Sequence, residues 1–188
     1  MFLCNTYADF LGGLGHLGLQ YAQAFGLRCL GVESADGPLE LAKSLNTGAR
    51  IADARLEDAV ELVRQMGAED CKSDTQEQGV DASIILPESQ RAFDYGMKLI
   101  KSHGKCVVVS FPEDGFHISA RDVVFRDISI IGSLVGSNKI LREMLDFSAR
   151  NNIRAVTKSF SLQNLNSLVA EYHKGGGGKL VLDMALSN

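Results

Sequence analysis

The stretch Gly12-Gly13-Leu14-Gly15-His16-Leu17-Gly18 carries the strongest structural signal in this chain, and Leu27-Arg28-Cys29-Leu30-Gly31-Val32-Glu33 completes it. The first stretch predicts a glycine-rich turn that opens a helix, and the second predicts a strand with an acidic residue at its end. This order is the fingerprint of a dinucleotide-binding turn. Glycines let the backbone approach a pyrophosphate closely, and the unpaired N–H groups of the first helical turn face that anion.

The surroundings of the turn support this interpretation. Apolar residues recur at helical spacing between Leu14 and Phe25, and Gly26 stands where a helix would stop. Glu33 follows Gly13 by about 20 residues, close to the spacing that the motif requires. Its carboxylate can accept hydrogen bonds from both hydroxyls of an adenosine ribose and would repel a 2′-phosphate, so the pattern favours NAD over NADP. A tight strand-to-helix turn without a ligand is the alternative interpretation.

Length and composition limit the number of domains and the kinds of partner that the chain could have. The chain has 188 residues, of which 45% are hydrophobic, which fits one domain or one domain with a small appendage. The formal net charge is −4, without a basic stripe, so we expect no nucleic-acid partner. The longest near-apolar stretch, Ile128–Val135, is too short for a membrane span. Residues 1–6 do not resemble a secretory signal, so we expect a cytoplasmic protein.

The four cysteines agree with a reducing compartment. Cys4, Cys29, Cys71 and Cys106 are widely scattered, and none has the spacing of a metal-ligand pair. Cys29 and Cys106 stand in apolar strand patterns, where we expect them to pack as small hydrophobic residues.

Strand and helix patterns alternate along most of the chain, which predicts an α/β domain with a parallel sheet. The polar stretch at residues 67–79 is expected to be a loop. Six strands with crossover helices match the Rossmann doubly wound fold, with strand order 3-2-1-4-5-6. The predicted strands lie near Thr6–Phe10, Arg28–Glu33, Arg50–Asp53, Ala82–Leu86, Lys105–Ser110 and Ile128–Ser133, and the predicted helices are Gly15–Phe25, Pro38–Leu45 (with Pro38 as its first residue), Leu56–Met66 and Ser89–Ser102.

The pattern changes after Gly136, which divides the chain into two predicted units. Residues 1–136 would form the Rossmann domain, and residues 137–188 a short C-terminal helix-strand extension. The extension is predicted to contain a helix at Lys139–Ala149, a strand at Ala155–Phe160, a helix at Leu162–His173, a glycine run at Gly175–Gly178 and a strand at Lys179–Asp183.

Several stretches together resemble one enzyme family more specifically than the glycine turn does alone. They are residues 12–22 (GGLGHLGLQYA), residues 30–33 (LGVE), residues 104–109 with 111–112, and residues 129–136 with 145–149. In this order they resemble the coenzyme-binding half of the zinc-type medium-chain alcohol dehydrogenases, especially the fungal and cinnamyl alcohol dehydrogenase branches.

This resemblance implies an oxidoreductase that moves a hydride between NAD and an alcohol, aldehyde or ketone. It implies that the turn binds the pyrophosphate, Leu86 borders the nicotinamide ribose, and Ser110, Phe111 and Pro112 wall the nicotinamide. Backbone groups of residues 133–135 would reach the carboxamide, and Ile128–Val135 would pair two copies in a homodimer. The implied cofactor-binding residues are Gly12, Gly13, Leu14, Gly15, Glu33, Leu86, Ser110, Phe111, Ser133, Val135 and Lys179.

The sequence also departs from the family at several positions. Phe10 stands where the family has the first glycine of its turn, and Asp9 stands in what should be a buried central strand. Lys179 replaces an arginine that reaches the pyrophosphate, which keeps the charge but loses the bidentate geometry. The glycine run before Lys179 is one residue shorter than in the family.

The family's catalytic domain, with its zinc ligands and proton relay, has no counterpart in this sequence. We therefore predict no catalytic residues and no zinc site in this chain, and expect it to be inactive alone. The alternatives are a stand-alone NAD-binding module or pseudoenzyme that acts through a protein partner, and a degenerate fragment that binds nothing well. The region at residues 138–188 would return to the missing domain in the family, so its apolar face lacks an evident partner here.

Other chemistries find weaker support. A short-chain dehydrogenase is disfavoured because Tyr7, Tyr21, Tyr95 and Tyr172 all lack a lysine four residues later. A methyltransferase remains compatible with the glycine turn and its acidic strand end alone, but the later stretches argue against it.

The histidines are not expected to be catalytic. His16 should contribute only its backbone at the start of the helix, and His103, His117 and His173 lack a serine or cysteine partner in a recognisable pattern. Asp53, at a strand edge, is expected to stabilise a turn.

Overall fold

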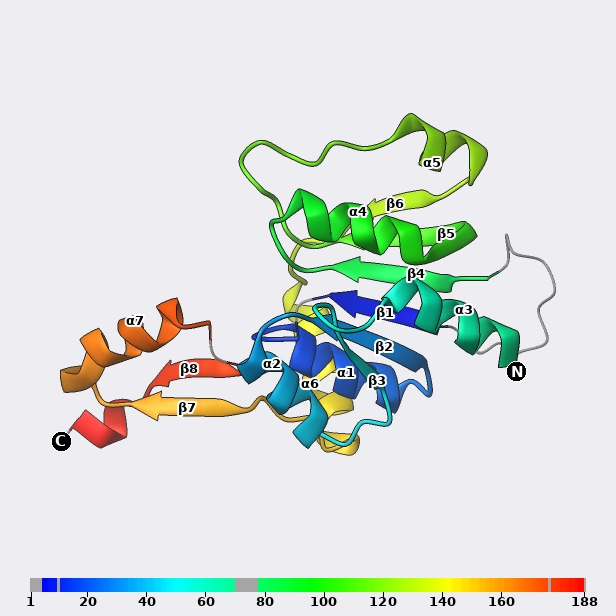
Figure 1. Ribbon diagram of the computed structural model, residues 1–188. Coiled ribbons are helices and arrows are strands. Elements are labelled where there is room, and N and C mark those ends of the chain that lie inside the picture. Colours follow the sequence, from blue (N-terminus) through cyan, green and yellow to red (C-terminus); the bar gives the residue numbers. More distant parts are fainter. Residues whose placement is uncertain (1–4, 10, 70–77, 176, 188) are drawn as a thin grey trace.

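The computed structural model describes residues 5–9, 11–69, 78–175 and 177–187. Its main body is a six-stranded parallel sheet, and a smaller two-stranded parallel sheet lies to one side (Figure 1). The large sheet has the order β3-β2-β1-β4-β5-β6, as the sequence predicted. Its strands are β1 (Asn5–Asp9), β2 (Arg28–Glu33), β3 (Arg50–Asp53), β4 (Val80–Ile85), β5 (Ile100–Val108) and β6 (Ser129–Gly132).

Helices cover both faces of this sheet, which makes the fold doubly wound. Helices α1 and α2 pack against one another and against β1, β2 and β3, while α3 and α4 pack together on the opposite face. The helices are α1 (Gly15–Ala24), α2 (Asp36–Ser44), α3 (Ala59–Glu69), α4 (Gln90–Leu99), α5 (Ala120–Phe125) and α6 (Asn138–Arg150).

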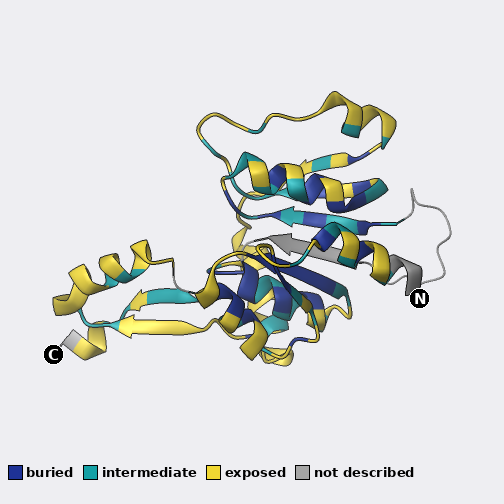
Figure 2. Cartoon of the chain, in the orientation of Figure 1, coloured by how far each residue is buried: buried dark blue, intermediate teal, exposed yellow. Residues whose placement is uncertain are grey.

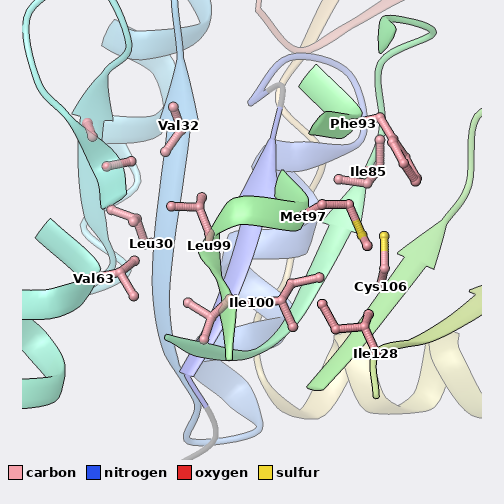
Figure 3. Packing of buried hydrophobic residues seen from close by; sticks show 13 residues of the cluster. Leu30, Val32, Val63, Ile85, Phe93, Met97, Leu99, Ile100, Cys106 and Ile128 are labelled. Atoms are coloured by element: carbon pink, nitrogen blue, oxygen red, sulfur yellow. The ribbon is translucent and has the colours of Figure 1, made fainter. Parts of the chain in front are cut away.

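Alternation along β2 divides the core between the two faces. Leu30 and Val32 point to the α3–α4 face and join the larger cluster, in which Phe93 is buried beside the strands (Figure 3). Cys29 belongs to the smaller cluster on the α1–α2 face. A strand whose successive side chains are buried on opposite faces is typical of a covered parallel sheet.

Both described cysteines are buried, as predicted. Burial in apolar surroundings raises the pKa of the Cys29 thiol to about 12 and also raises that of Cys106. Cys4 and Cys71, like Phe10, lie outside the described residues, as do the side chain of Asp9 and most of the predicted loop at residues 67–79.

The boundary between α4 and β5 differs most from the prediction. The helix ends at Leu99 instead of Ser102, and β5 begins at Ile100 instead of Lys105. The register between β4 and β5 shifts there, so that the chain gains extra residues before Lys105 pairs with Ala82. Gly104 permits this irregularity, because a Cβ there would lie 2.9 Å from the carbonyl oxygen of Lys101.

Two other helix predictions need correction, and one helix was missed. Helix α2 begins at Asp36, so Pro38 is its third residue; the carboxylate of Asp36 instead lies in the first turn, where the helix dipole favours it. Helix α3 begins at Ala59 instead of Leu56, because the backbone N–H groups of Leu56 and Glu57 donate to the carbonyl of Asp53 in a turn. The short helix α5 was not predicted.

The C-terminal part forms a small β-α-β unit that projects from the body (Figure 1). Strands β7 (Thr157–Phe160) and β8 (Lys179–Leu182) pair in parallel, and α7 (Leu165–His173) connects them. The predicted helix from Leu162 begins as a 3₁₀ turn, η1 (Leu162–Asn164), and a second 3₁₀ turn, η2 (Met184–Ser187), follows β8. Within the described ranges, no helix combines the length and apolar character needed to cross a membrane.

Candidate functional site

The predicted site residues gather along one edge of the large sheet. Because all its strands are parallel, their carboxyl ends lie at the same edge, where the loops after β1, β2, β4, β5 and β6 begin. The strand order reverses between β1 and β4, and ligands of open α/β sheets bind in the crevice at such a reversal. The candidate site is therefore the edge that carries the glycine turn.

The glycine turn leaves backbone donors available. Helix α1 starts at Gly15, and no side chain caps its first turn. The N–H groups of Gly13, Leu14 and Gly15 have no acceptor among the described residues. The first turn of α1 contains no acidic residue, so nothing on the helix itself competes for these donors. This arrangement suits a phosphate group, which accepts backbone N–H bonds at a helix N-terminus.

Lys179 lies beside the same turn, although it is more than 160 residues away in sequence. A Cβ placed on Gly13 would lie 3.3 Å from Nζ of Lys179 and 3.6 Å from the carbonyl oxygen of Gly178. A side chain at residue 13 would therefore fill the space between the turn and the ammonium group. The fold thus brings together a glycine cradle, N–H groups without an acceptor among the described residues, and a positive charge, which the sequence placed in separate units.

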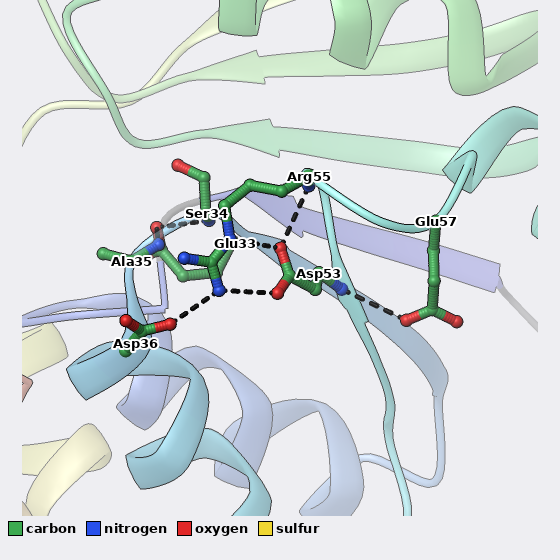
Figure 4. Close-up of polar contacts among 7 residues, drawn as sticks. All are labelled: Glu33, Ser34, Ala35, Asp36, Asp53, Arg55 and Glu57. Atoms are coloured by element: carbon green, nitrogen blue, oxygen red, sulfur yellow. Dashed lines mark hydrogen bonds and ion pairs between the residues drawn. The ribbon is translucent and has the colours of Figure 1, made fainter.

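Glu33 is already engaged by the protein (Figure 4). Its Oε2 accepts the backbone N–H of Leu11 at 3.0 Å, and its Oε1 accepts those of Ser34 at 2.7 Å and Ala35 at 3.0 Å. The residue is only 2% exposed. The carboxylate therefore ties the glycine turn and the start of α2 to the end of β2, and its contact with a ribose stays a prediction.

Two further carboxylates, those of Asp36 and Asp53, lie next to Glu33. Arg55 donates from Nη2 to Asp36 and to Asp53, both at 2.6 Å, and from Nε to Asp53 at 2.9 Å (Figure 4). Hydrogen bonds from Arg55 lower the pKa of Asp53 to about 2. Asp53 also accepts the backbone N–H of Arg55, so its predicted turn role is confirmed.

The far end of the edge carries the residues predicted to contact a nicotinamide. The hydroxyl of Ser110 donates to the carbonyl of Pro87 at 2.8 Å, next to Leu86, and the backbone N–H of Ser133 donates to the carbonyl of Val108 at 2.9 Å. The N–H of Ser133 is thus occupied, whereas Phe111 and Val135 are exposed. Val135 also adopts a left-handed backbone with φ of 35°, a strained conformation for a β-branched residue.

The imidazole of His16 has a role that the sequence did not suggest. The residue is fully buried, its Nδ1 lies 2.7 Å from the carbonyl oxygen of Gly12, and its Nε2 accepts the backbone N–H of Val156 at 3.1 Å. Burial lowers the pKa of this histidine. The ring therefore points into the protein and joins α1 to the segment before β7.

Among the described residues, the other histidines and the acidic side chains do not assemble a metal site. His103 forms an exposed ion pair with Asp127 at 2.9 Å. In the part of the chain that the structure describes, no three histidine, cysteine or acidic side chains come close enough together to hold a metal ion. The described residues therefore do not fit the zinc that the resemblance implies for a catalytic domain.

A doubly wound parallel sheet with a glycine turn at its carboxyl edge defines the Rossmann class of dinucleotide-binding domains. Within that class the chain belongs to the zinc-binding dehydrogenase family, whose family model matches residues 13–150. It corresponds to the coenzyme-binding half of that family.

Sequence relatives agree with this assignment, and solved structures share the fold. The chain is 36% identical over 177 residues to an alcohol dehydrogenase of Geobacillus stearothermophilus, an alignment that covers 93% of this chain and 48% of the relative. The alcohol dehydrogenase of the archaeon Aeropyrum pernix superposes with a TM-score of 0.76 at 22% identity, over 94% of this chain and 49% of that one. A structure described as an NAD-dependent alcohol dehydrogenase superposes with a TM-score of 0.77 at 20% identity, over 96% and 51%. The chain thus spans about half the length of the curated relatives it matches.

Proposed function

We propose that this chain is the NAD-binding part of an alcohol dehydrogenase-like oxidoreductase. The observation that carries the proposal is the juxtaposition of the Lys179 ammonium with the glycine turn, whose N–H groups at residues 13–15 lack acceptors among the described residues. Two independent sources of positive potential, the helix start and the lysine, converge on one cradle, and a side chain at residue 13 would occupy part of its space. When bound, NAD supplies the carbon that accepts or releases the hydride.

The acidic corner at the ends of β2 and β3 supports NAD over NADP. Glu33, Asp36 and Asp53 bring three carboxylates to this corner, and Arg55 is the cation that pairs with two of them. The surplus of negative charge would repel a 2′-phosphate, while a carboxylate oxygen retains acceptor capacity for a ribose hydroxyl. Glu33 would then serve both the turn and the sugar.

The exposed side chain of Phe111 and the neighbouring Ser110 are proposed to flank the nicotinamide. Their loop follows β5, on the other side of the strand reversal from the glycine turn. A dinucleotide lying along the edge would reach from the acidic corner, over the turn, to this loop. Exclusion of water by Phe111 would be its main contribution there.

A binding titration tests the proposal. We expect NADH to bind more tightly than NADPH, and Lys179→Met to weaken NADH binding about tenfold, as expected for loss of a charge-assisted hydrogen bond of about 1.5 kcal/mol. Lys139→Met, which removes an exposed lysine on α6, is the matched control and should bind as the unaltered protein does. No binding of either nucleotide at millimolar concentration, or equal effects of the two substitutions, would contradict the proposal.

We also propose that two copies associate through the edge of β6. This strand is the last in the sheet, and Ile131, Leu134 and Val135 are exposed on it and just after it. Sedimentation velocity at rising concentration should show a dimer that Ile131→Lys abolishes. Val124→Lys on α5, at an apolar position that is more exposed than Ile131, should leave it intact; a monomer at all concentrations would rule the dimer out.

A specific observation supports a second candidate function, that of an NAD-binding module acting through a protein partner. Helix α6 exposes Ile140, Leu141 and Leu145 along its length. An apolar helix face of this kind fits either the other half of a full-length dehydrogenase or a separate protein. Binding of NADH without alcohol oxidation, in the presence of zinc, would favour this candidate over an active enzyme.

A further inference from the structure

Both ring nitrogens of His16 are used, and only one protonation state satisfies both contacts. Because the N–H of Val156 is a donor, Nε2 must carry a lone pair, and the proton therefore lies on Nδ1 and is donated to the carbonyl of Gly12. His16 thus links the glycine turn to a residue that is 140 positions later in the sequence.

The same residue, Val156, leads directly to Lys179. Its carbonyl oxygen accepts the backbone N–H of Lys179 at 2.8 Å, so both backbone groups of Val156 are fixed. Gly178 allows this close approach, since it has a φ of 86° and a Cβ there would lie 2.7 Å from the carbonyl oxygen of Val156. A continuous path of two hydrogen bonds therefore runs from His16 to the lysine beside Gly13.

A second side chain of α1 holds the same segment independently. Gln20 accepts the N–H of Arg154 at 3.0 Å and donates to its carbonyl at 2.9 Å. Because this pair of bonds clamps the peptide at residue 154, loss of the His16 contact would leave the segment attached to α1. The expected consequence is a local shift of Val156 and Lys179 instead of detachment of the extension.

We propose that His16 is a positioning residue, whose Nε2 holds Val156 and thereby fixes the Lys179 ammonium over the phosphate-facing turn. The proposal rests on the proposed function, since it concerns how that site grips a dinucleotide phosphate. It assigns the buried ring to ligand affinity as well as to packing. A histidine that served packing alone would affect stability without a preference for phosphate-bearing ligands.

Two conservative substitutions separate the two ring contacts. In His16→Gln the side-chain oxygen reaches the position of Nε2 and can accept the Val156 N–H, while the donor to Gly12 is lost. In His16→Asn the side-chain amide reaches the position of Nδ1 and can donate to Gly12, while the Val156 contact is lost. The proposal requires the second substitution to be the harmful one.

The experiment measures NADH and adenosine binding by calorimetry for both variants, alone and combined with Lys179→Met. We expect His16→Gln to bind NADH within about twofold of the unaltered protein and His16→Asn to bind about fivefold more weakly, with adenosine affinity unchanged in both. With Lys179→Met present, His16→Asn should have no further effect, because the positioned group is gone.

Three results would overturn the inference. Equal losses in the glutamine and asparagine variants, a loss that persists in the Lys179→Met background, or a parallel loss of adenosine binding would each show that His16 does not act through Lys179. Amide hydrogen exchange at Lys179 gives a second measurement if an asparagine variant is less stable: exchange should rise in that variant and not in the glutamine variant. If the unaltered protein binds no NADH, both the proposed function and this inference fail. If it binds NADH but the effects of His16→Asn and Lys179→Met on affinity add, only this inference fails.

Discussion

The body around the six-stranded sheet contains many buried residues, whereas the extension from residue 137 onward is mostly exposed (Figure 2). The body buries apolar side chains in two clusters, one on each face of the sheet. In the extension, Ile153 is the one buried hydrophobic residue among those the structure describes, whereas Leu141, Leu165 and Val169 are exposed. The body therefore has a core of its own, and the extension has almost none.

Contacts with α1 hold the extension to the body. Phe147 stacks on Phe25 with ring centroids 4.6 Å apart, and the hydroxyl of Tyr21 lies 2.7 Å from that of Ser148. Together with the contacts of His16 and Gln20, these join α6 and the segment before β7 to the body. A region with few buried apolar contacts opens at a lower free energy than the core, so we expect the extension to open first.

Truncation of a core aromatic residue should have the largest effect. Phe93 is 2% exposed and stacks on Phe116 at 4.8 Å, so Phe93→Ala is expected to lower the free energy of unfolding by about 3–5 kcal/mol. Tyr172 in the extension is 72% exposed, and Tyr172→Ala should change it by less than about 0.5 kcal/mol. Urea unfolding of both variants measures the contrast, and equal effects would erase the distinction between the two regions.

Adding a side chain where the body is tightly packed should lower the free energy of unfolding by a smaller amount. Gly104→Ala places a Cβ against backbone atoms at the β4–β5 register shift, and we expect a loss of about 1–3 kcal/mol in unfolding free energy. Gly132→Ala in β6 is the control, because no heavy atom lies within 4 Å of a Cβ there. If the alanine at residue 104 were as harmless as that at 132, the tight approach described for β5 would be wrong.

Weakening the contact between the extension and α1 should lower the free energy of unfolding by a smaller amount still. Phe147→Ala removes the stack on Phe25, and we expect a loss of about 1 kcal/mol, confined to the extension. Hydrogen exchange should then rise at the backbone amides of Val156 and Lys179 while those of β2 stay protected. A uniform rise across the whole chain would contradict the view that the extension opens separately.

Mild acid should have the smallest effect on the free energy of unfolding, and it acts where His16 joins α1 to the segment before β7. The pKa of His16 lies below its ordinary value of 6.5 because of burial, so the unfolded chain binds a proton more readily than the folded one. The contribution of neutral His16 to the free energy of unfolding is therefore fully present above pH 6.5 and falls as the pH drops from 6.5 toward the lowered pKa. His16→Gln should remove this part of the pH dependence; an unchanged profile between pH 7 and 5 would exclude His16 as its source.

Much of the fold could be predicted because it follows from local pattern. The glycine turn, the acidic end of β2 and the alternation of elements give the strand order, and the carboxyl ends of the strands give the edge on which the candidate site lies. The start of β5 could not be predicted, because Leu99 and Ile100 continue an apolar helical pattern and the register shift depends on the neighbouring strand. Helix α5 is too short and too exposed to leave a periodic signal.

The sequence predicted residues that lie along the same edge of the sheet, but not the hydrogen bonds that join them to the rest of the protein. The sequence gives no direction for the backbone N–H groups of Leu11, Ser34 and Ala35, so the engagement of Glu33 by the protein itself could not be foreseen. The contact between His16 and Val156 depends on how the chain returns to α1 after α6, which no local pattern records.

The reactivity of the two buried cysteines reports how often each side of the sheet opens. Cys29 is enclosed on the α1–α2 side of the sheet and Cys106 lies in the cluster on the α3–α4 side, and neither thiol can react until its own layer opens. With Cys4 and Cys71 changed to serine, the rates at which a thiol reagent modifies the remaining two would time the opening of each layer separately. A nucleotide that grips the glycine turn should slow the first rate more than the second, and so reveal through chemistry on which side of the sheet it acts.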